Sequence, residues 1–152
     1  MSETTYSPTP WQADANRIDA AVATLYRRTF AYVSRELTAD GIGQGKQAVI
    51  RILDTQDGIS QAAVADRGSL DRGNVARIVA TLEKDGYVRR ERDPKALHGN
   101  LVFLTEKGRA AALRMHEVVD GWNESCFTEL DEAEIHALAD VLDHLAARSS
   151  AI

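Results

Sequence analysis

The sequence predicts a mainly α-helical protein of the α+β class, built from amphipathic helices and one small β-hairpin. Apolar residues recur every three to four positions over most of the 152 residues, which is the period of a helix with one buried face. An extended pattern replaces this period only near the middle of the chain, at residues 87–92 and 101–104. A hydrophobic fraction of 44% and a charged fraction of 27% are ordinary for one globular domain of this length.

The first predicted helix covers residues 11–40. It follows a polar segment, residues 1–10, that shows no periodicity and is expected to be a flexible tail. The helix has no internal Gly or Pro and ends where Gly41 and Gly43 make its continuation costly. A helix of about 30 residues is longer than the core of a compact domain of this size can cover. We therefore expect part of its apolar face to contact a second copy of the chain.

Two short capped helices are predicted after an amphipathic helix at residues 45–55. Ser60 can accept a hydrogen bond from a backbone N–H in the first turn of the next helix, which Gly68 is expected to close. Asp71 is the corresponding cap of the helix after it, which runs to Gly86. Two short helices joined by a tight turn form a helix-turn-helix.

A basic hairpin follows the helix pair. Strand-forming residues at 87–92 and 101–104 flank a loop that contains Pro94 and Gly99, so a hairpin with a long tip is predicted. A helix pair followed by such a hairpin is a winged helix-turn-helix, in which the hairpin is the wing.

Two further helices complete the chain, with Thr105 and Asp131 as their expected caps. Cys126 shares an apolar stripe with Trp122 on the first of them, so we expect a buried structural thiol in a reducing compartment. The chain is therefore predicted to be a single integrated domain with three parts: a winged helix-turn-helix lobe at residues 42–105 and long helices on either side of it, at residues 11–40 and 106–149.

The second helix of the pair has an outward face that suits DNA. When its aliphatic residues face the core, the opposite face carries arginines between very small residues: Arg72, Gly73, Ala76, Arg77 and Ala80, with Asn74 at the margin. Small residues let the backbone approach a duplex closely, while arginine can reach guanine edges or phosphates and asparagine can read adenine. Double-stranded DNA is therefore the predicted partner.

The net charge of −5 argues against such a partner only until it is divided by region. Residues 44–109 hold twelve basic and nine acidic residues, a net charge of +3. Residues 1–43 carry a net charge of −1 and residues 110–152 carry −7. A basic centre between acidic ends can direct a polyanion to one face of the molecule.

From Ile42 to Gly108 the sequence resembles the MarR family of winged helix-turn-helix transcriptional regulators. The matching stretches are Ile59-Ser60-Gln61, residues 71–90, and the hairpin from Asp93-Pro94 to Gly108. The resemblance implies a homodimer that binds pseudo-palindromic operator DNA, as a repressor that responds to a ligand. It also implies that residues 11–40 and 106–149 are the dimerisation helices. The residues expected to contact DNA are Ser60, Gln61, Arg72, Asn74, Arg77, Arg90, Arg92, Lys95 and His98.

The wing tip departs from the family pattern. That pattern reads Asp-Pro-x-Asp-Arg-Arg, whereas here Asp93-Pro94-Lys95 is followed by Ala96-Leu97-His98. The arginine that would enter the minor groove is missing, which leaves weaker salt dependence, altered sequence preference and loss of DNA binding open. The alternative function is a winged-helix protein that acts through protein contacts in place of DNA.

The resemblance also implies a small-molecule effector, bound between the long helices and the lobe. The weak candidates for its site are Trp11, Tyr26, Tyr32, Met115 and Trp122, although residues of these types are more often plain core.

Other function classes have little support in the sequence. It contains no phosphate-binding glycine loop, no Gly-x-Ser-x-Gly and no His-Glu-x-x-His, so neither an enzyme nor a cofactor is predicted. His136, Asp140 and His144 share one helix face, but no further ligand lies nearby in sequence, so no metal site is predicted. With no run of about 18 apolar residues and no secretory pattern at Met1, we expect a cytoplasmic protein without a membrane partner.

Overall fold

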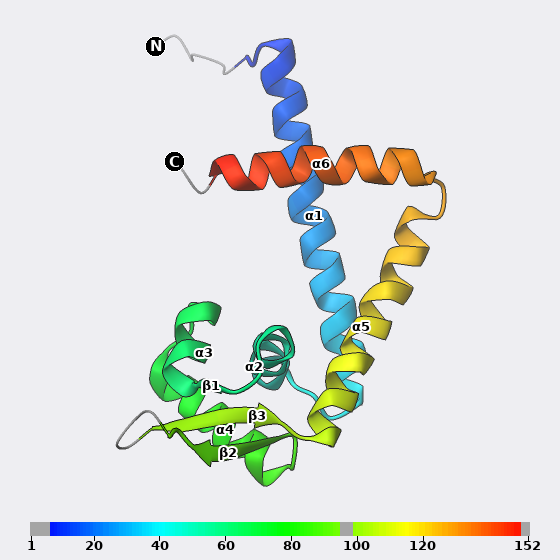
Figure 1. The fold of residues 1–152 in the computed structure, drawn as a ribbon. Helices are drawn as coiled ribbons and strands as arrows, with labels where there is room; N and C mark the ends of the chain where they lie inside the picture. The colour runs from blue at the N-terminus through cyan, green and yellow to red at the C-terminus, as the bar shows by residue number, and fades with distance from the viewer. Residues whose placement is uncertain (1–6, 95–98, 150–152) are drawn as a thin grey trace, which may run out of the picture.

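The computed structural model describes residues 7–94 and 99–149. Its elements follow in the order α1 (Pro10–Ala39), α2 (Gln44–Thr55), β1 (Ile59–Ser60), α3 (Gln61–Gly68), α4 (Arg72–Lys84), β2 (Val88–Arg92), β3 (Asn100–Leu104), α5 (Glu106–Phe127) and α6 (Glu132–Ser149). The mainly helical winged helix-turn-helix class is confirmed (Figure 1). Of the predicted tail, residues 1–6 lie outside the described residues.

The helix starts predicted from capping residues are confirmed. The Ser60 hydroxyl accepts a hydrogen bond from the backbone N–H of Ala63, and an Asp71 carboxylate oxygen accepts one from that of Asn74. Thr105 caps α5 in the same way. At the start of α6, Asp131 and Glu134 exchange hydrogen bonds as a capping box.

The sheet and the turn between α3 and α4 each differ from the prediction. Ile59–Ser60 forms a third strand, which pairs antiparallel with β3, so the sheet order is β1-β3-β2. A two-residue strand carries no periodicity, which is why the sequence did not indicate it. The residue that ends α3 in the left-handed conformation is Ser69, with φ of 48°, and not Gly68. Gly68 is required for another reason: a Cβ there would lie 2.8 Å from Leu70 and 2.9 Å from Ile52.

The hydrophobic core lies inside the lobe, where α2, α3 and α4 pack on one another and on the sheet. Large aliphatic side chains from each of these elements are fully buried, among them Leu53, Val64, Val79, Leu82 and Val102. The lobe-proximal parts of α1 and α5 extend this core through Leu37 and Met115. The inward face of α4 is therefore held by a continuous apolar contact.

Beyond the lobe, the long helices have little cover. In Figure 1, α1 and α5 extend away from the lobe, and α6 lies well away from the lobe and crosses α1 in this view. α6 has no buried residue, and large apolar side chains on α1 and α6 are 39–71% exposed: Trp11, Ile18, Val22, Leu25, Tyr26, Phe30, Ile135, Leu138, Val141 and Leu145. Cys126 is also exposed, so the expectation of a buried thiol is wrong for the single chain. In the described part of the chain, no helix has the length and apolarity needed to cross a membrane.

Candidate nucleic-acid interface

The outward face of α4 is exposed as its sequence pattern predicts. Val75, Val79 and Leu82 are fully buried against the lobe core, whereas the arginines and small residues on the opposite face are exposed. The helix begins at the Asp71 cap, so its first turn is fixed at the point where Arg72 leaves the backbone. Burial on one side therefore positions the arginine side of α4 toward solvent.

The two arginines of this face rest on polar neighbours. The Arg77 guanidinium donates a hydrogen bond of 2.8 Å to the Asn74 side-chain oxygen, and Arg72 contacts the Asp66 carboxylate at 3.3 Å. Both arginines are exposed. Surface contacts of this kind contribute little to stability, so the guanidiniums can exchange them for base edges or phosphates.

A groove runs beside α4, and the start of α2 forms its other wall. It is lined by Asn74, Arg77, Ile78, Ala80 and Thr81 of α4 and by residues 43–46. Gly45 permits the close approach, because a Cβ there would lie 3.2 Å from the Ile78 side chain. The sequence did not indicate that residues 43–46 lie beside the recognition helix, since this contact joins segments some 30 positions apart.

The structure describes four of the six remaining predicted DNA contacts. Ser60 and Gln61 are half-buried at the start of α3, where the Ser60 hydroxyl already serves as the cap. Arg90 on β2 forms an ion pair with Glu83 of α4, and Arg92 is exposed near the end of the described hairpin. Lys95 and His98 lie outside the described residues, as does the atypical segment Ala96–His98.

Two carboxylates at the end of α4 are held in their charged form. The hydrogen bond from Arg90 lowers the pKa of Glu83 below its ordinary value of 4.5. The hydrogen bond from Lys46, with Nζ 2.7 Å from the carboxylate oxygen, lowers the pKa of Asp85 below its ordinary value of 3.8. These pairs join the end of the recognition helix to the wing and to the start of α2.

We expect low pH to destabilise the fold at the C-terminal end of α4. Because both pKa values are lowered by folding, their stabilisation is fully present above the ordinary values and is lost as the pH falls through the folded ones. We expect the unfolding temperature to decrease from about pH 5 to pH 3. Glu83→Gln should lower stability at neutral pH and flatten this decrease, whereas Glu124→Gln, at an exposed position of α5, should do neither. An unaltered acid profile in Glu83→Gln would contradict the assignment.

A separate hollow of about 180 Å³ lies between α1, α2 and α5. Of the five effector candidates, Tyr26 and Met115 line it. Tyr32 and Trp122 pack on each other outside it, with ring centroids 5.1 Å apart, and Trp11 is 71% exposed near the start of α1. The other lining residues were not singled out by the sequence: Thr29, Phe30, Val33, Gln47, Arg51, Asp54, Ala112, His116 and Val119.

The histidines of α6 do not gather ligands. His136 approaches Asp140 at 3.6 Å on the exposed helix surface. Over residues 7–94 and 99–149, no group of three His, Cys, Asp or Glu side chains is placed to hold a metal ion.

The fold and the arginine face define a winged helix-turn-helix protein of the DNA-binding class. The model of the MarR family matches residues 45–95. The HTH-type transcriptional regulator BilQ of Clostridium symbiosum is 28% identical over 127 residues, which cover 83% of this chain and 88% of BilQ.

Solved structures agree with this assignment. A MarR transcriptional regulator from Methanosarcina mazei Go1 superposes with a TM-score of 0.72 at 30% identity, over 87% of this chain and 88% of that one. A putative MarR family regulator from Listeria monocytogenes, solved with a 26mer DNA, has the same fold, with a TM-score of 0.69 at 23% identity over 85% and 86% of the two chains. The chain belongs to the MarR family, and it is a DNA-binding transcriptional regulator, not an enzyme.

Proposed function

We propose that this protein is a sequence-specific repressor that binds a pseudo-palindromic operator as a homodimer and is released by a small ligand. The observation that carries the proposal is the exposed arginine face of α4, backed by the lobe core. A regulator of this kind acts where the chromosome is, in the cytoplasm.

On DNA, each α4 enters a major groove. Arg72, Asn74 and Arg77 then reach base edges. The small side chains of Gly73 and Ala76 let the helix backbone come close to the duplex. Six further residues contact the phosphate backbone, where they set register and orientation without reading sequence. They are Ser60, Gln61, Arg90, Arg92, Lys95 and His98. The Listeria monocytogenes neighbour crystallised with DNA supports this use of the fold.

The long helices supply the dimer contact. Apolar side chains along α1 and α6 have little cover within the chain, and several of them are more than 40% exposed. Such a surface on a protein of this size marks an interface, and a two-fold pair of recognition helices reads two inverted half-sites. The acidic helices then lie away from the duplex, which limits indiscriminate binding.

Leu138→Glu on α6 should convert the dimer into a monomer, because it places a charge in the apolar contact. Sedimentation at micromolar concentration should then give a 16.7 kDa species in place of one of twice that mass. Ala80→Glu adds the same charge on the outward face of α4, so it should leave the dimer intact while it prevents DNA binding. A 16.7 kDa species for the unaltered protein would overturn the dimer.

The hollow between α1, α2 and α5 is the proposed effector site. Its walls are largely apolar, with Tyr26, Phe30 and Met115 among them, and Arg51 and His116 supply polar groups. This mixture is typical of small-molecule sites. A ligand there would separate helices that also position the lobe, which gives a physical route from binding to release.

Selection of bound fragments from genomic DNA tests the proposal. Recovery of a shared inverted repeat is the expected result, and its binding should weaken steeply with salt because phosphate contacts release counterions. Failure to enrich any shared sequence would favour the alternative, a winged-helix protein that acts through protein contacts.

A further inference from the structure

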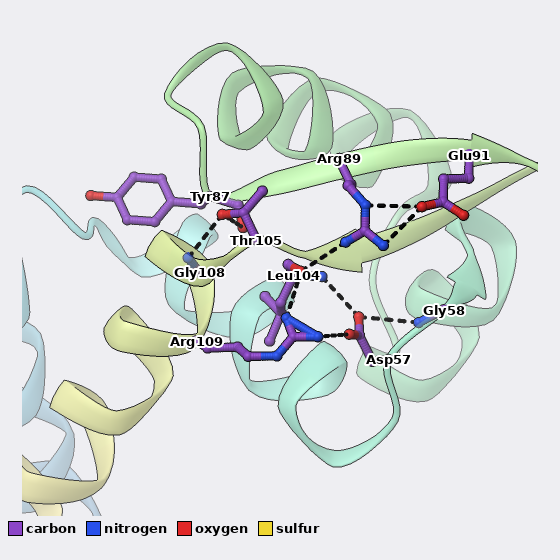
Figure 2. A network of polar contacts seen from close by, with 9 residues as sticks. All are labelled: Asp57, Gly58, Tyr87, Arg89, Glu91, Leu104, Thr105, Gly108 and Arg109. Carbon is purple, nitrogen blue, oxygen red and sulfur yellow. Dashed lines mark hydrogen bonds and ion pairs between the residues drawn. The ribbon is translucent and has the colours of Figure 1, made fainter.

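The end of strand β3 is clamped by side chains from three different segments, and Figure 2 shows the arrangement. The backbone N–H of Leu104 donates a hydrogen bond of 2.8 Å to the Asp57 carboxylate. The backbone carbonyl of Leu104 accepts hydrogen bonds from two guanidiniums, Arg109 at 2.7 Å and Arg89 at 3.1 Å. We call Asp57, Leu104 and Arg109 the wing root.

Asp57 and Arg109 contact each other as well as the backbone of strand β3. Asp57 uses one oxygen for the backbone N–H groups of Leu104 and Gly58, and the other for Arg109 at 3.1 Å. The side chain of Asp57 is 30% exposed and that of Arg109 is 59% exposed, so the carboxylate is partly shielded from water and the guanidinium is not. The two residues lie 52 positions apart and join the α2–β1 loop to the first turns of α5.

The arginine from β2 is held by its own neighbours. Arg89 forms an ion pair with Glu91 on the same strand at 2.8 Å and lies over the ring of Phe103, 4.8 Å from its centroid. In the register of the hairpin Arg89 faces Phe103, on the sheet face opposite to the buried Val88 and Val102. Arg89 therefore reaches the backbone of Leu104 from the side of the sheet that does not pack on the core, whereas the Leu104 side chain is buried in the core.

A hairpin of two five-residue strands has little rigidity of its own. The third strand contributes two residues only, and a two-stranded hairpin is marginally stable in water. The direction in which the wing leaves the lobe therefore depends on how its base is attached. Leu104 pairs with Val88, the first residue of β2, so the clamp holds the hairpin at the end nearest α4.

We propose that Asp57 and Arg109 are positioning residues for DNA recognition, which fix the wing relative to α4 through Leu104. This inference rests on the proposed function, because it assigns the two residues to the geometry of the DNA contact and not to the contact itself. Asp57 acts on Arg109 through its negative charge and on Leu104 through a backbone hydrogen bond. A substitution can therefore remove the first interaction and keep the second.

Asp57→Asn is the sharpest variant, since the amide oxygen can still accept the backbone hydrogen bonds while the anion that faces Arg109 is lost. Asp40→Asn is its matched control, because Asp40 likewise pairs with an arginine of α5, Arg114 at 2.9 Å, and is not part of the wing root. Both variants remove one negative charge, which by itself favours binding to a polyanion. A loss of affinity in Asp57→Asn alone therefore cannot come from net charge.

The measurement is operator affinity together with a hydroxyl-radical footprint, on a fragment recovered by the genomic selection. We expect Asp57→Asn to bind roughly fivefold to tenfold more weakly, with protection lost at the flanks that the wing covers and kept in the two major grooves. Arg109→Lys should behave similarly, because an ammonium cannot contact Leu104 and Asp57 with the fork geometry of a guanidinium. Asp40→Asn should retain the full footprint.

Hydrogen exchange on the protein without DNA supplies a second readout. Amides of β2 and β3 should exchange faster in Asp57→Asn, whereas those of α4 should not change. Unchanged exchange together with an unchanged footprint would overturn the inference and leave the proposed function standing. Absence of any operator for the unaltered protein would overturn the proposed function, and the positioning role would fall with it.

Discussion

Arg77→Ala should bind its operator at least about 30-fold more weakly than the unaltered protein. A bidentate contact between arginine and guanine contributes about 1–3 kcal/mol, and a homodimer loses one from each half-site. At about 1.4 kcal/mol for each factor of ten, the lower limit of 2 kcal/mol already gives this loss. The side chain is exposed and donates a hydrogen bond to Asn74 in the same helix, so its loss should not destabilise the fold.

Fluorescence anisotropy over a range of salt concentrations checks this result and separates two modes of contact. Loss of a base contact leaves the salt slope unchanged, whereas loss of one phosphate contact in each protomer lowers it by about 2. Arg77→Lys keeps the charge but not the fork, so it should recover phosphate binding without sequence preference. Arg17→Ala, on a fully solvated turn of α1, changes charge equally and should bind normally. Equal affinity for Arg77→Ala and Arg17→Ala would place the reading face elsewhere.

Gly108→Ala should destabilise the fold by about 1–3 kcal/mol, which is the usual effect of forcing an extra methyl group into a packed site. A Cβ at this position would lie 2.1 Å from the backbone oxygen of Tyr87 and 3.0 Å from the Leu104 side chain. Backbone cannot move aside as a flexible side chain can. The carbonyl is also fixed by Thr105, whose hydroxyl donates to it at 3.1 Å and whose N–H donates at 3.0 Å (Figure 2).

Gly121→Ala provides the matched control on the same helix. No atom lies within 4 Å of a Cβ built at Gly121, so only the intrinsic preference of alanine for a helix operates there, at up to about 1 kcal/mol in favour of the variant. Thermal unfolding should therefore shift in opposite directions for the two substitutions. A shift to higher temperature in both would show that α5 and Tyr87 separate without strain.

Local sequence patterns predicted much of this fold, because helix caps and helical faces are determined by residues that lie close together in the chain. Ser60 and Asp71 start their helices as expected, and the arginines of α4 face solvent because the aliphatic residues between them are buried. The prediction for Cys126 was wrong for a related reason: an apolar stripe indicates that a face is covered, but not whether the cover comes from the same chain.

Long-range contacts were beyond the reach of a single sequence. Asp57 and Arg109 read as ordinary surface charges, since nothing in their own neighbourhoods indicates that they meet at Leu104. The strand at Ile59–Ser60 exists only because β3 lies beside it, and the hollow between α1, α2 and α5 combines residues from three distant segments. Such features require the chain to be folded before they can be seen.

The length and the neighbours of helix α2 place it against both the groove and the hollow. Lys46 lines the groove beside the recognition helix, and Gln47, the next residue, lines the hollow between the long helices. Their Cα atoms are about 3.8 Å apart, on a helix of 12 residues that spans about 18 Å. A helix this short moves as a rigid rod. The lining of the hollow and the lining of the groove beside α4 therefore share one short helix, so a shift of α2 would change both of them together.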